Sequence, residues 1–487
     1  MKTKKKYGFF KVLLVILLLV VVATYFIKGR EGSISYLAVG DVFLNYVQSF
    51  YYFFDTAIFI LVVGGLYGVL NKVPSYKKLV KSIATKVTDK KKLFVIITTV
   101  VFALLSSLTG LNMLLLIFIP FVVSIILVLG YDKLVALSST MLAVMVGFIG
   151  GVFVTFKDSS SQYATAYTTF DKMVGLDGNW ENIFPKILLL LIAVGLLIFY
   201  IVKHINKLEN EEISDELGHN DVFLVEARGK NGKVIKENYT NVKVWPLVVM
   251  SVILLVVLVM GYLPWSSLFG IDCFDKFHTW LTGLKIGDYV VFTSLISSSF
   301  TAFGNFGSLG SFMMAIVLIA LFILILKFVA KIKFSDIMDG FIYGVKKMIL
   351  PAMIVALAYT VLVCVYNNGF METIISSAMD KFGDNVVIDS IIAIFGSILH
   401  VDCYYTVAGV FSPIVSGLSD KANLDVYAVM FQSLYGLVQI VGPTSLLLIA
   451  SLSYLEVPYS KWLKYIWRFV VELFIVIFIV LMIVSLL

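Results

Sequence analysis

The chain has 487 residues, of which 60% are hydrophobic and only 14% are charged, and its mean hydropathy is +0.98. Soluble domains carry about one quarter charged residues, so this composition excludes an ordinary soluble protein and indicates an all-α polytopic membrane protein in a lipid bilayer. The formal charge of +7 comes largely from lysines beside apolar runs, which predicts a topology signal and no nucleic-acid partner.

Apolar runs long enough for a hydrocarbon core of about 30 Å recur along the chain. The first, within 8–28, follows a basic stretch but no clear small-x-small cleavage site follows it, so we expect a retained helix. A more broken apolar stretch covers 387–418. The other runs lie at 52–70, 93–108, 111–129, 134–155, 185–203, 244–263, 309–331, 348–366, 424–455 and 463–487.

Lysine placement predicts the orientation of these runs. Because positive residues favour the cytoplasmic side, we expect a multi-pass protein of the cytoplasmic membrane with a cytoplasmic N-terminus. The lysine clusters lie at 2–6, 72–92, 203–243, 327–347 and 461–468.

The polar stretch at 204–243 divides the chain into parts. It has mixed charge and Gly-Asn turns, which predict a cytoplasmic connector. The expected parts are a first membrane repeat (1–203), the connector (204–243), a linking helix with an outer segment (244–308) and a second, inverted membrane repeat (309–487).

The two halves resemble each other in sequence. FIPFV at 118–122 matches FSPIV at 411–415, and an aspartate follows each proline by 12 positions, at Asp132 and Asp425. A helix breaker comes 18 positions later in both halves, as Gly-Gly in the first and Pro-Thr in the second. We expect both aspartates to be helix caps near the membrane surface.

Lysine positions also predict how the halves are oriented. The pair of apolar segments at 93–129 begins and ends beside lysines, so it enters and leaves on the inside, whereas the equivalent pair at 387–418 must do so on the outside. The predicted fold therefore has two inverted-topology repeats with re-entrant hairpins and broken transmembrane helices. Such repeats are typical of secondary transporters.

Four polar or glycine-rich interruptions lie inside apolar runs, at 106–112, 147–158, 399–406 and 439–445. Unpaired backbone groups are costly in hydrocarbon, so a break is tolerated where it is buried in protein or lines a cavity. Paired breaks therefore predict a binding site, although Gly and Ser also serve helix packing. The candidate substrate or ion ligands are Ser107, Thr109, Asn112, Gly150, Gly151, His400, Asp402, Thr406, Gln439, Gly442, Pro443, Thr444 and Ser445.

Asp402 is the strongest single candidate, because an ionisable residue inside a membrane segment marks a functional site by default. The alternative interpretation is that Asp402 makes only a structural contact near the outer membrane surface. Asp402 and the lack of a clearly intramembrane arginine favour a solute with an ammonium group, such as a basic amino acid in antiport. A C4-dicarboxylate held at helix N-termini is the alternative. Unwound carbonyls at 147–151 and 441–445 suit Na⁺ coupling, whereas Asp402 with His400 suits H⁺.

An enzyme is a weaker alternative than a carrier of a small polar metabolite. The histidines form no HExxH pair, the chain has no G-x-x-x-x-G-K-[ST] loop, and the three cysteines are too scattered for a disulfide framework or a thiolate metal site. We therefore expect no enzymatic activity, no metal and no cofactor. A channel or structural scaffold is the remaining alternative.

Longer stretches resemble the YfcC-type carriers, which are grouped with DcuC-like and ArcD-like proteins in the ion-transporter superfamily. The most specific match is the closing stretch FQSLYGLVQIVGPTSLLLIASLSYLEVPYSKWLKY at 431–465. Three earlier stretches are also similar to the family: FILVVGGLYGVLNK (59–72), LTGLNMLLLIFIPFVVSIILVLGYDKLVALSS followed by VGFIGGVF (108–153), and FIYGVKKMILPAMIVALAYTVLV (341–363).

The resemblance implies a scaffold region, a transport region that moves like an elevator, and a homodimer, as in many superfamily members. It implies C4-dicarboxylates or arginine–ornithine exchange as substrates. Two departures bear on the substrate. Met113 and Leu114 stand where relatives usually carry two glutamates, and His400-Val401-Asp402-Cys403 replaces a Ser-Gly-Ser-Gly-like tip.

Overall fold

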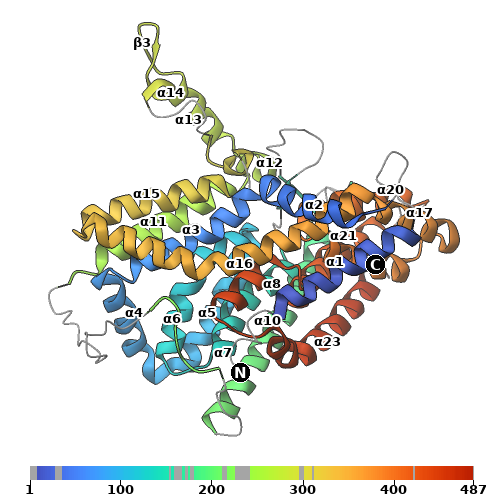
Figure 1. The fold of residues 1–487 in the computed structure, drawn as a ribbon, viewed down its shortest axis with the longest axis horizontal. Coiled ribbons are helices and arrows are strands. Elements are labelled where there is room, and N and C mark those ends of the chain that lie inside the picture. Colours follow the sequence, from blue (N-terminus) through green and yellow to red (C-terminus); the bar gives the residue numbers. More distant parts are fainter. Residues whose placement is uncertain are drawn as a thin grey trace.

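The computed structural model is almost entirely helical (Figure 1). In its described part, 7 helices are long and apolar enough to cross a membrane, or up to 8 if the bent pair α2 (Val39–Tyr52) and α3 (Phe54–Leu70) forms one span. The structure describes residues 8–27, 36–152, 155–157, 167–170, 174–175, 180–210, 217–224, 242–295, 301–309, 312–419 and 423–485.

Two groups of helices make up the body. The first, which we call the α3–α16 layer, runs across the upper part of Figure 1. It contains α1 (Gly8–Phe26), α2, α3, α11 (Trp245–Tyr262), α15 (Met313–Val329) and α16 (Phe334–Asn368). The second, the α8–α21 bundle, contains α5 (Lys91–Thr109), α6 (Ile119–Val128), α7 (Lys133–Leu137), α8 (Ala143–Ile149), α10 (Trp180–Glu209), α18 (Val386–Leu399), α19 (Cys403–Thr406), α20 (Ser412–Gly417), α21 (Leu424–Val441), α22 (Leu446–Tyr454) and α23 (Tyr459–Val484).

Shorter elements connect these groups. An arm that projects at the top of Figure 1 is built from α13, β3, β4 and α14, with β3 and β4 antiparallel. The bounds of the connecting elements are α4 (Pro74–Val87), η2 (Thr88–Lys90), η3 (Met113–Ile117), η4 (Ser138–Leu142), β1 (Thr155–Lys157), β2 (Tyr167–Thr169), α12 (Trp265–Phe269), α13 (Cys273–Thr282), β3 (Lys285–Ile286), β4 (Tyr289–Val290), α14 (Val291–Leu295), η5 (Phe306–Leu309), α17 (Phe370–Phe382) and η6 (Val407–Phe411).

Glycines hold α3 and α16 in backbone contact. Gly64 and Gly68 on α3 face Gly340 and Gly344 on α16, one turn apart on each helix. A Cβ added at Gly64 would lie 2.7 Å from the carbonyl oxygen of Gly344, and one at Gly340 would lie 2.7 Å from that of Gly68. Small residues four apart let membrane helices approach closely, so dispersion contacts stabilise the layer without a hydrophobic driving force.

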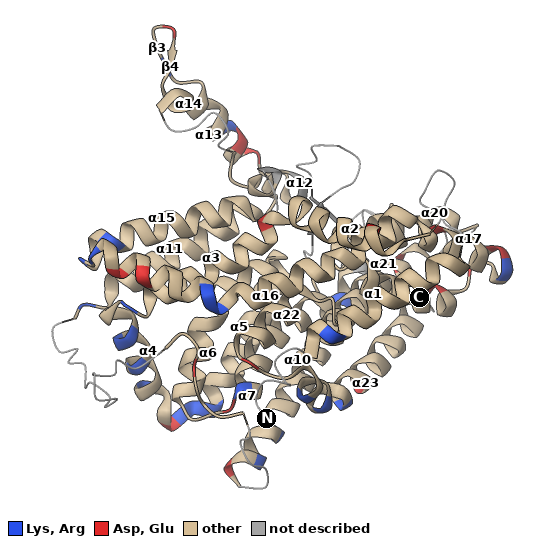
Figure 2. Ribbon diagram, viewed as in Figure 1, with Lys and Arg blue, Asp and Glu red and all other residues tan. Residues whose placement is uncertain are grey.

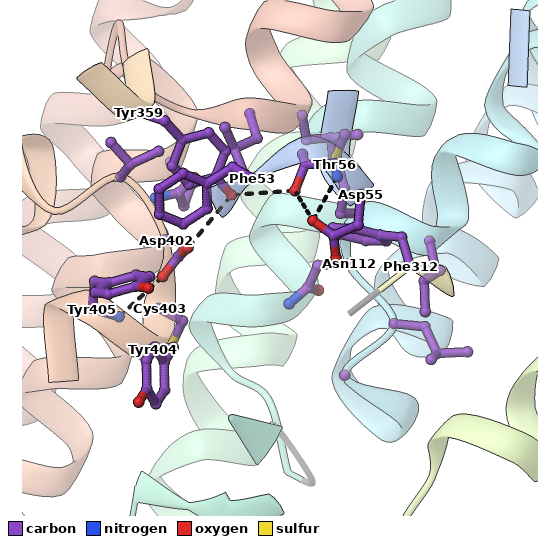
Figure 3. A pocket seen from close by; sticks show the side chains of 18 of the residues that line it. Phe53, Asp55, Thr56, Asn112, Phe312, Tyr359, Asp402, Cys403, Tyr404 and Tyr405 are labelled. Atoms are coloured by element: carbon purple, nitrogen blue, oxygen red, sulfur yellow. Dashed lines mark hydrogen bonds between the residues drawn. The ribbon is translucent and has the colours of Figure 1, made fainter. Parts of the chain in front are cut away.

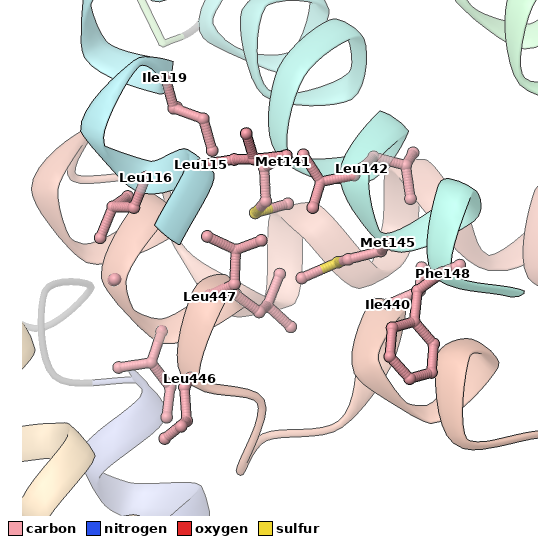
Figure 4. Close-up of a cluster of buried hydrophobic side chains, with 14 of the residues drawn as sticks. Leu115, Leu116, Ile119, Met141, Leu142, Met145, Phe148, Ile440, Leu446 and Leu447 are labelled. Atoms are coloured by element: carbon pink, nitrogen blue, oxygen red, sulfur yellow. The ribbon is translucent and has the colours of Figure 1, made fainter. Parts of the chain in front are cut away.

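Close packing also joins the two halves of the sequence inside the bundle. A Cβ on Gly436 of α21 would lie 2.6 Å from Cγ1 of Ile149 at the end of α8. Figure 4 shows the neighbouring cluster, in which leucines of η3 and of the start of α22 gather around Met141, Leu142 and Met145, while Phe148 of α8 lies beside Ile440 of α21. The interrupted helices of both halves therefore share one core.

Three expected spans differ from the structure. The run 111–129 is wrong as a span, because α6 has 10 residues and extends only about 15 Å. The run 134–155 ends earlier, since α7, η4 and α8 form one short helix from Lys133 to Ile149. The run 348–366 is the second part of α16, which continues for 35 residues with Pro351 inside it.

The predicted backbone breaks are confirmed. Helix α5 ends before Gly110, which has φ 66°, and α18 ends before Val401, which has φ 64°. Helix α21 ends at Val441, and α22 begins after Gly442-Pro443-Thr444-Ser445. The fourth break begins after Ile149, although part of 147–158 lies outside the described residues. The division into two inverted repeats and the proposed boundaries stay predictions.

The two matched aspartates have different roles. Asp132 caps α7, since its Oδ1 accepts from the backbone N–H of Val135 at 2.8 Å, and its Oδ2 lies 3.0 Å from Nε2 of His204. Its prediction as a cap is therefore confirmed. Asp425 lies in the first turn of α21 and is not at the cap position, so its prediction as a cap is wrong. An acidic residue there still favours the helix N-terminus electrostatically.

Part of the connector packs into the body. Leu217–Leu224 lies against both helix groups, and the fully buried Phe223 ring is 5.6 Å from the ring centroid of Tyr67 and 5.6 Å from that of Tyr454. Asp221 accepts a hydrogen bond from Ser124 and one from the Phe223 N–H at 2.8 Å. Burial raises the pKa of the Asp221 carboxyl. The described connector segment is therefore part of the packed structure.

Charged side chains are unevenly distributed. Figure 2 shows basic residues gathered around α4, α7 and the lower part of the molecule, whereas the middle of the helices is largely free of blue and red. Lys91 and Lys92 pair with Glu209 at 3.1 and 2.6 Å at this end. This distribution agrees with a predicted cytoplasmic face on the α4 and α7 side.

Candidate functional site

A cavity of about 700 Å³ lies where the α3–α16 layer meets the bundle (Figure 3). Its walls come from the bend between α2 and α3, from both hairpin tips, and from α8, α16, α21 and the start of α22. Ligand pockets for small molecules usually measure about 300–1,000 Å³. The lining is mostly aromatic and apolar, with the few polar side chains Asp55, Thr56, Thr109, Asn112, Asp402, Cys403 and Gln439 and several tyrosines.

The bend between α2 and α3 places the first carboxylate. The two helices meet at 64°, and Phe53 between them leaves the helical conformation. Asp55 lies in the first turn of α3, where its Oδ1 accepts from the Thr56 N–H at 2.7 Å. A carboxylate in this position uses backbone donors that the helix leaves without intrahelical partners.

The first hairpin tip contributes an amide. Gly110 has left-handed backbone geometry, which ends α5 and turns the chain, and its N–H bonds the carbonyl of Ser106 at 2.9 Å. The Ser106 hydroxyl donates to Oδ1 of Asn112. Because the amide oxygen is used in this bond, the side-chain NH₂ of Asn112 is the donor available to the cavity.

The second hairpin tip contributes the other carboxylate. Val401 is a buried β-branched residue with positive φ, a conformation that costs free energy and is held by its surroundings. It turns the chain so that Asp402 caps α19, with Oδ1 accepting from the Tyr405 N–H at 3.0 Å. The same aspartate therefore fixes the tip and faces the cavity.

Asp55, Thr56, Tyr359 and Asp402 form a chain of oxygen–oxygen contacts with a carboxylate at each end, and we call this chain the oxygen relay. The Tyr359 hydroxyl lies 3.4 Å from Oδ2 of Asp402 and 3.4 Å from Oγ1 of Thr56, which in turn lies 3.4 Å from Oδ1 of Asp55 (Figure 3). These contacts are long for O–H···O hydrogen bonds. The relay crosses from the α3–α16 layer to the second hairpin.

Aromatic rings surround the Asp402 end of this relay. Phe53 stacks on Tyr359 with centroids 3.8 Å apart and an interplanar angle of 6°, and its edge meets Tyr405 at 5.6 Å. Tyr435 of α21 also lines the cavity. Aromatic faces attract cations, so the rings and the carboxylates favour positive charge in this part of the cavity.

Comparison with known proteins decides the family. A family model described as "C4-dicarboxylate anaerobic carrier", DcuC, matches residues 50–486. The chain belongs to the DcuC family. It is therefore a membrane transporter that binds a small molecule within the bilayer, and it is not an enzyme.

Two other comparisons add little to this assignment. No curated protein matches the chain significantly. Among solved structures, the chain is similar to the Alcanivorax borkumensis YdaH transporter, whose crystal structure "reveals an unusual topology", with 11% identity over 96% of this chain and 97% of that chain. The TM-score of 0.40 is too low to support an argument from that structure.

The cavity of this DcuC-family transporter contains four of the predicted ligands, namely Thr109, Asn112, Asp402 and Gln439. They come from the first tip, the second tip and the end of α21, so the fold brings three of the four predicted breaks to one place. Their roles in binding stay predictions. The Thr109 hydroxyl also bonds the backbone of its own helix at the carbonyl of Leu105.

The fourth break packs beside the cavity. Ser107 donates to the carbonyl of Gly150 at 3.1 Å, and a Cβ on Gly150 would lie 2.5 Å from the backbone nitrogen of Leu190. Gln432 donates to the carbonyl of Gly151 at 2.7 Å. The freed backbone groups of this break are therefore bound by neighbouring side chains, which is a packing role.

His400 and Thr406 also lie outside the cavity lining. His400 is 2% exposed, its Nδ1 contacts the carbonyl of Gly396 at 3.0 Å, and its Nε2 lies against Gly409. Thr406 donates to the backbone carbonyl of Asp402 at 2.7 Å. Both residues support the shape of the second tip.

The break at Gly442-Pro443, between α21 and α22, lies next to the cavity but outside its lining. Thr444 donates to the carbonyl of Ile398 at 2.7 Å, which ties this turn to α18. Ser445 is 1% exposed, and its hydroxyl has no hydrogen-bond partner among the described residues. It precedes Leu446, which lines the cavity, at the N-terminus of α22. Gly442 and Pro443 form the turn itself.

Sequence reasoning missed Asp55, Thr56, Tyr359 and Tyr405. Asp55 lies within the run 52–70, so the rule that marks Asp402 also applies to it. It was overlooked because an acidic residue near the start of a run also fits an ordinary helix N-terminus. The tyrosines carry no sequence signal that separates them from the other aromatic residues of the chain.

Removing the hydroxyl of Tyr359 tests the relay. We expect Tyr359→Phe to fold normally, because the ring that stacks on Phe53 stays, and to lower the rate of solute flux about fivefold, since one hydrogen-bonding group contributes roughly 1 kcal/mol. The measurement is solute flux in proteoliposomes. Tyr366→Phe, at an exposed position of the same helix outside the cavity lining, is the control and should keep wild-type flux.

Proposed function

We propose that this chain is a secondary active transporter that carries a small carboxylate metabolite, of the C4-dicarboxylate class that names its family, across the cytoplasmic membrane. Membership of the DcuC family and one observation support this proposal. The interruptions of both halves of the chain meet at one cavity between two helix groups. A binding site formed by broken helices from both halves of a chain is typical of carriers that work by alternating access.

Neutral donors support the binding of a carboxylate. The Asn112 and Gln439 amides line the cavity, and α22 begins beside it with its backbone N–H groups and the buried Ser445 hydroxyl. Helix N-termini attract carboxylates without fixed positive charge. Asp55 and Asp402 oppose a dianion, so the carboxylate must enter together with a cation or a proton.

A basic amino acid is the second candidate, as in arginine–ornithine antiport. The observation in its favour is the chemistry at one end of the cavity, where Asp402, Tyr359, Tyr405 and Tyr435 suit an ammonium or guanidinium group. The amides at the other end suit an α-carboxylate. Within the DcuC family, we also propose the YfcC type, a homodimer and a cytoplasmic N-terminus.

Counterflow separates the two substrate classes. Purified protein in proteoliposomes preloaded with unlabelled malate or arginine is supplied with the same compound in labelled form, with and without Na⁺ and H⁺ gradients. We expect transient accumulation of malate and none of arginine. Accumulation of arginine alone would reverse the order of the candidates, and rates that rise linearly without counterflow would indicate a channel.

A further inference from the structure

We propose that the oxygen relay is a proton-binding site, at which Asp402 takes up one proton during transport. The inference rests on the carrier function proposed above and assigns its coupling ion. The relay consists of Asp55, Thr56, Tyr359 and Asp402, joined by three oxygen–oxygen contacts of 3.4 Å.

The number of hydrogens in the relay leads to this assignment. If all three contacts are to be hydrogen bonds, each needs one hydrogen, yet the ionised carboxylates supply none and the two hydroxyls supply one each. If Thr56 donates to Asp55 and Tyr359 donates to Asp402, no hydrogen remains for the contact between Thr56 and Tyr359. One contact is therefore incomplete while both carboxylates are ionised.

A third proton completes the relay. When an O–H bond forms on Oδ2 of Asp402, that group donates to Tyr359, Tyr359 donates to Thr56, and Thr56 donates to Asp55. The proton comes from water and lowers the negative charge of the cavity by one. A neutral carboxyl at this position also costs less to desolvate than a carboxylate.

The surroundings of Asp402 offer no fixed positive charge to its carboxylate. No Lys or Arg stands among the described residues that line the cavity. In the part of the chain that the structure describes, no group of three or more His, Cys, Asp or Glu side chains converges on one point. Na⁺ held by hydroxyl and carbonyl oxygens is the competing coupling ion, and the flux measurements below separate it from the proton. The titratable groups that face Asp402 are Tyr359 on α16, Tyr435 on α21, Asp55 on α3, and Cys403, Tyr404 and Tyr405 on its own segment.

His400 does not take the proton from Asp402. Its Nδ1 bonds the carbonyl of Gly396, and its Nε2 lies so close to Gly409 that a Cβ there would overlap it. Both ring nitrogens therefore face the hairpin's own backbone. The relay hydroxyls of Tyr359 and Thr56 are instead the groups that connect Asp402 to the other wall of the cavity.

The position of the relay links proton binding to movement. Asp55, Thr56 and Tyr359 belong to the α3–α16 layer, whereas Asp402 belongs to the second hairpin of the bundle. Displacement of the hairpin separates Asp402 from Tyr359. The separation leaves an isolated charge in an apolar cavity unless Asp402 keeps its proton, so the protonated hairpin is the form that moves at lower cost.

Infrared difference spectroscopy of the purified full-length protein tests proton binding without knowledge of the substrate. We expect a carboxylic C=O stretching band that titrates with pH, shifts in D₂O and is lost in Asp402→Asn. In Tyr359→Phe the band should persist at a shifted frequency, because the protonated carboxyl loses its acceptor. Asp389→Asn is the matched control and should keep the band, since Asp389 lies on α18 of the same hairpin outside the cavity, where it accepts a hydrogen bond from Tyr427 of α21 at 2.6 Å.

Flux measurements separate this inference from the proposed function. Malate and arginine counterflow is measured between about pH 6 and pH 8, where the rate of a carrier that moves only when protonated falls about tenfold per pH unit above the titration point. Flux without pH dependence and without the band would overturn the proton site and leave the carrier function. A band without flux of either solute would overturn the proposed substrates. A requirement for Na⁺ with no titrating band would replace the proton by a metal ion.

Discussion

Replacing Asp402 by alanine should lower solute flux about 100-fold. The substitution removes a carboxylate whose two hydrogen bonds, from the Tyr405 N–H and from the Tyr359 hydroxyl, contribute roughly 1.5 kcal/mol each. A total of about 3 kcal/mol corresponds to about two factors of ten. The measurement is initial counterflow of malate, or of arginine, in proteoliposomes of equal protein content.

Two controls separate lost binding from lost structure. Asp389→Asn changes a buried carboxyl on the same hairpin that does not line the cavity, and we expect its flux to remain. The unfolding temperature of Asp402→Ala, followed by size-exclusion chromatography after heating, should fall by only a few degrees, because the loss of one helix cap costs roughly 1 kcal/mol. Undiminished flux in Asp402→Ala would contradict a role for this residue at the site.

Leucine at Gly68 should prevent assembly of the α3–α16 layer. A Cβ at this position would overlap the carbonyl oxygen of Gly340, which is backbone and cannot move aside without separating the helices. Overpacking of a side chain against side chains costs roughly 1–3 kcal/mol, and a clash with backbone costs more. We expect little or no monodisperse protein in detergent, measured by fluorescence-detected size-exclusion chromatography.

Gly195→Leu is the matched control for this prediction. Gly195 lies in α10, a membrane-crossing helix, and a Cβ there would meet nothing within 4 Å. The same change in residue type therefore adds only a lipid-facing or surface side chain, and we expect wild-type yield. Equal yields from Gly68→Leu and Gly195→Leu would show that the contact between α3 and α16 is not needed for assembly.

The breaks were predictable because their causes are local. Gly110 and Gly442-Pro443 disfavour a continuous helix in any surroundings, and a break within an apolar run must lie against protein or a cavity. The cavity-facing residues Thr109, Asn112, Asp402 and Gln439 follow from that rule. The substrate class was harder to predict from the sequence. The charge of Asp402 alone favours a solute with an ammonium group, whereas the family is described by C4-dicarboxylates.

The other wall of the cavity was not predictable from local pattern. Asp55 and Tyr359 meet Asp402 only because glycines bring α3 and α16 into contact and the bend at Phe53 turns α3 toward the hairpin. Thr56 and Tyr359 are 303 positions apart and Tyr359 and Asp402 are 43 positions apart, and a single sequence carries no direct signal for either contact. The sequence also predicts a helix shorter than α16, because Lys346 and Lys347 suggest that a helix begins after them. In the structure α16 continues through both lysines.

The packed connector segment at 217–224 contacts both helix groups, so a relative movement of the groups would disturb it. Phe223 touches Tyr67, which belongs to α3, and Tyr454, which belongs to α22. Any sliding of one group past the other must pull this ring away from at least one of these partners. If transport slides one group past the other, we expect the backbone amides of 217–224 to exchange with deuterium at a rate that depends on which side of the membrane the cavity faces.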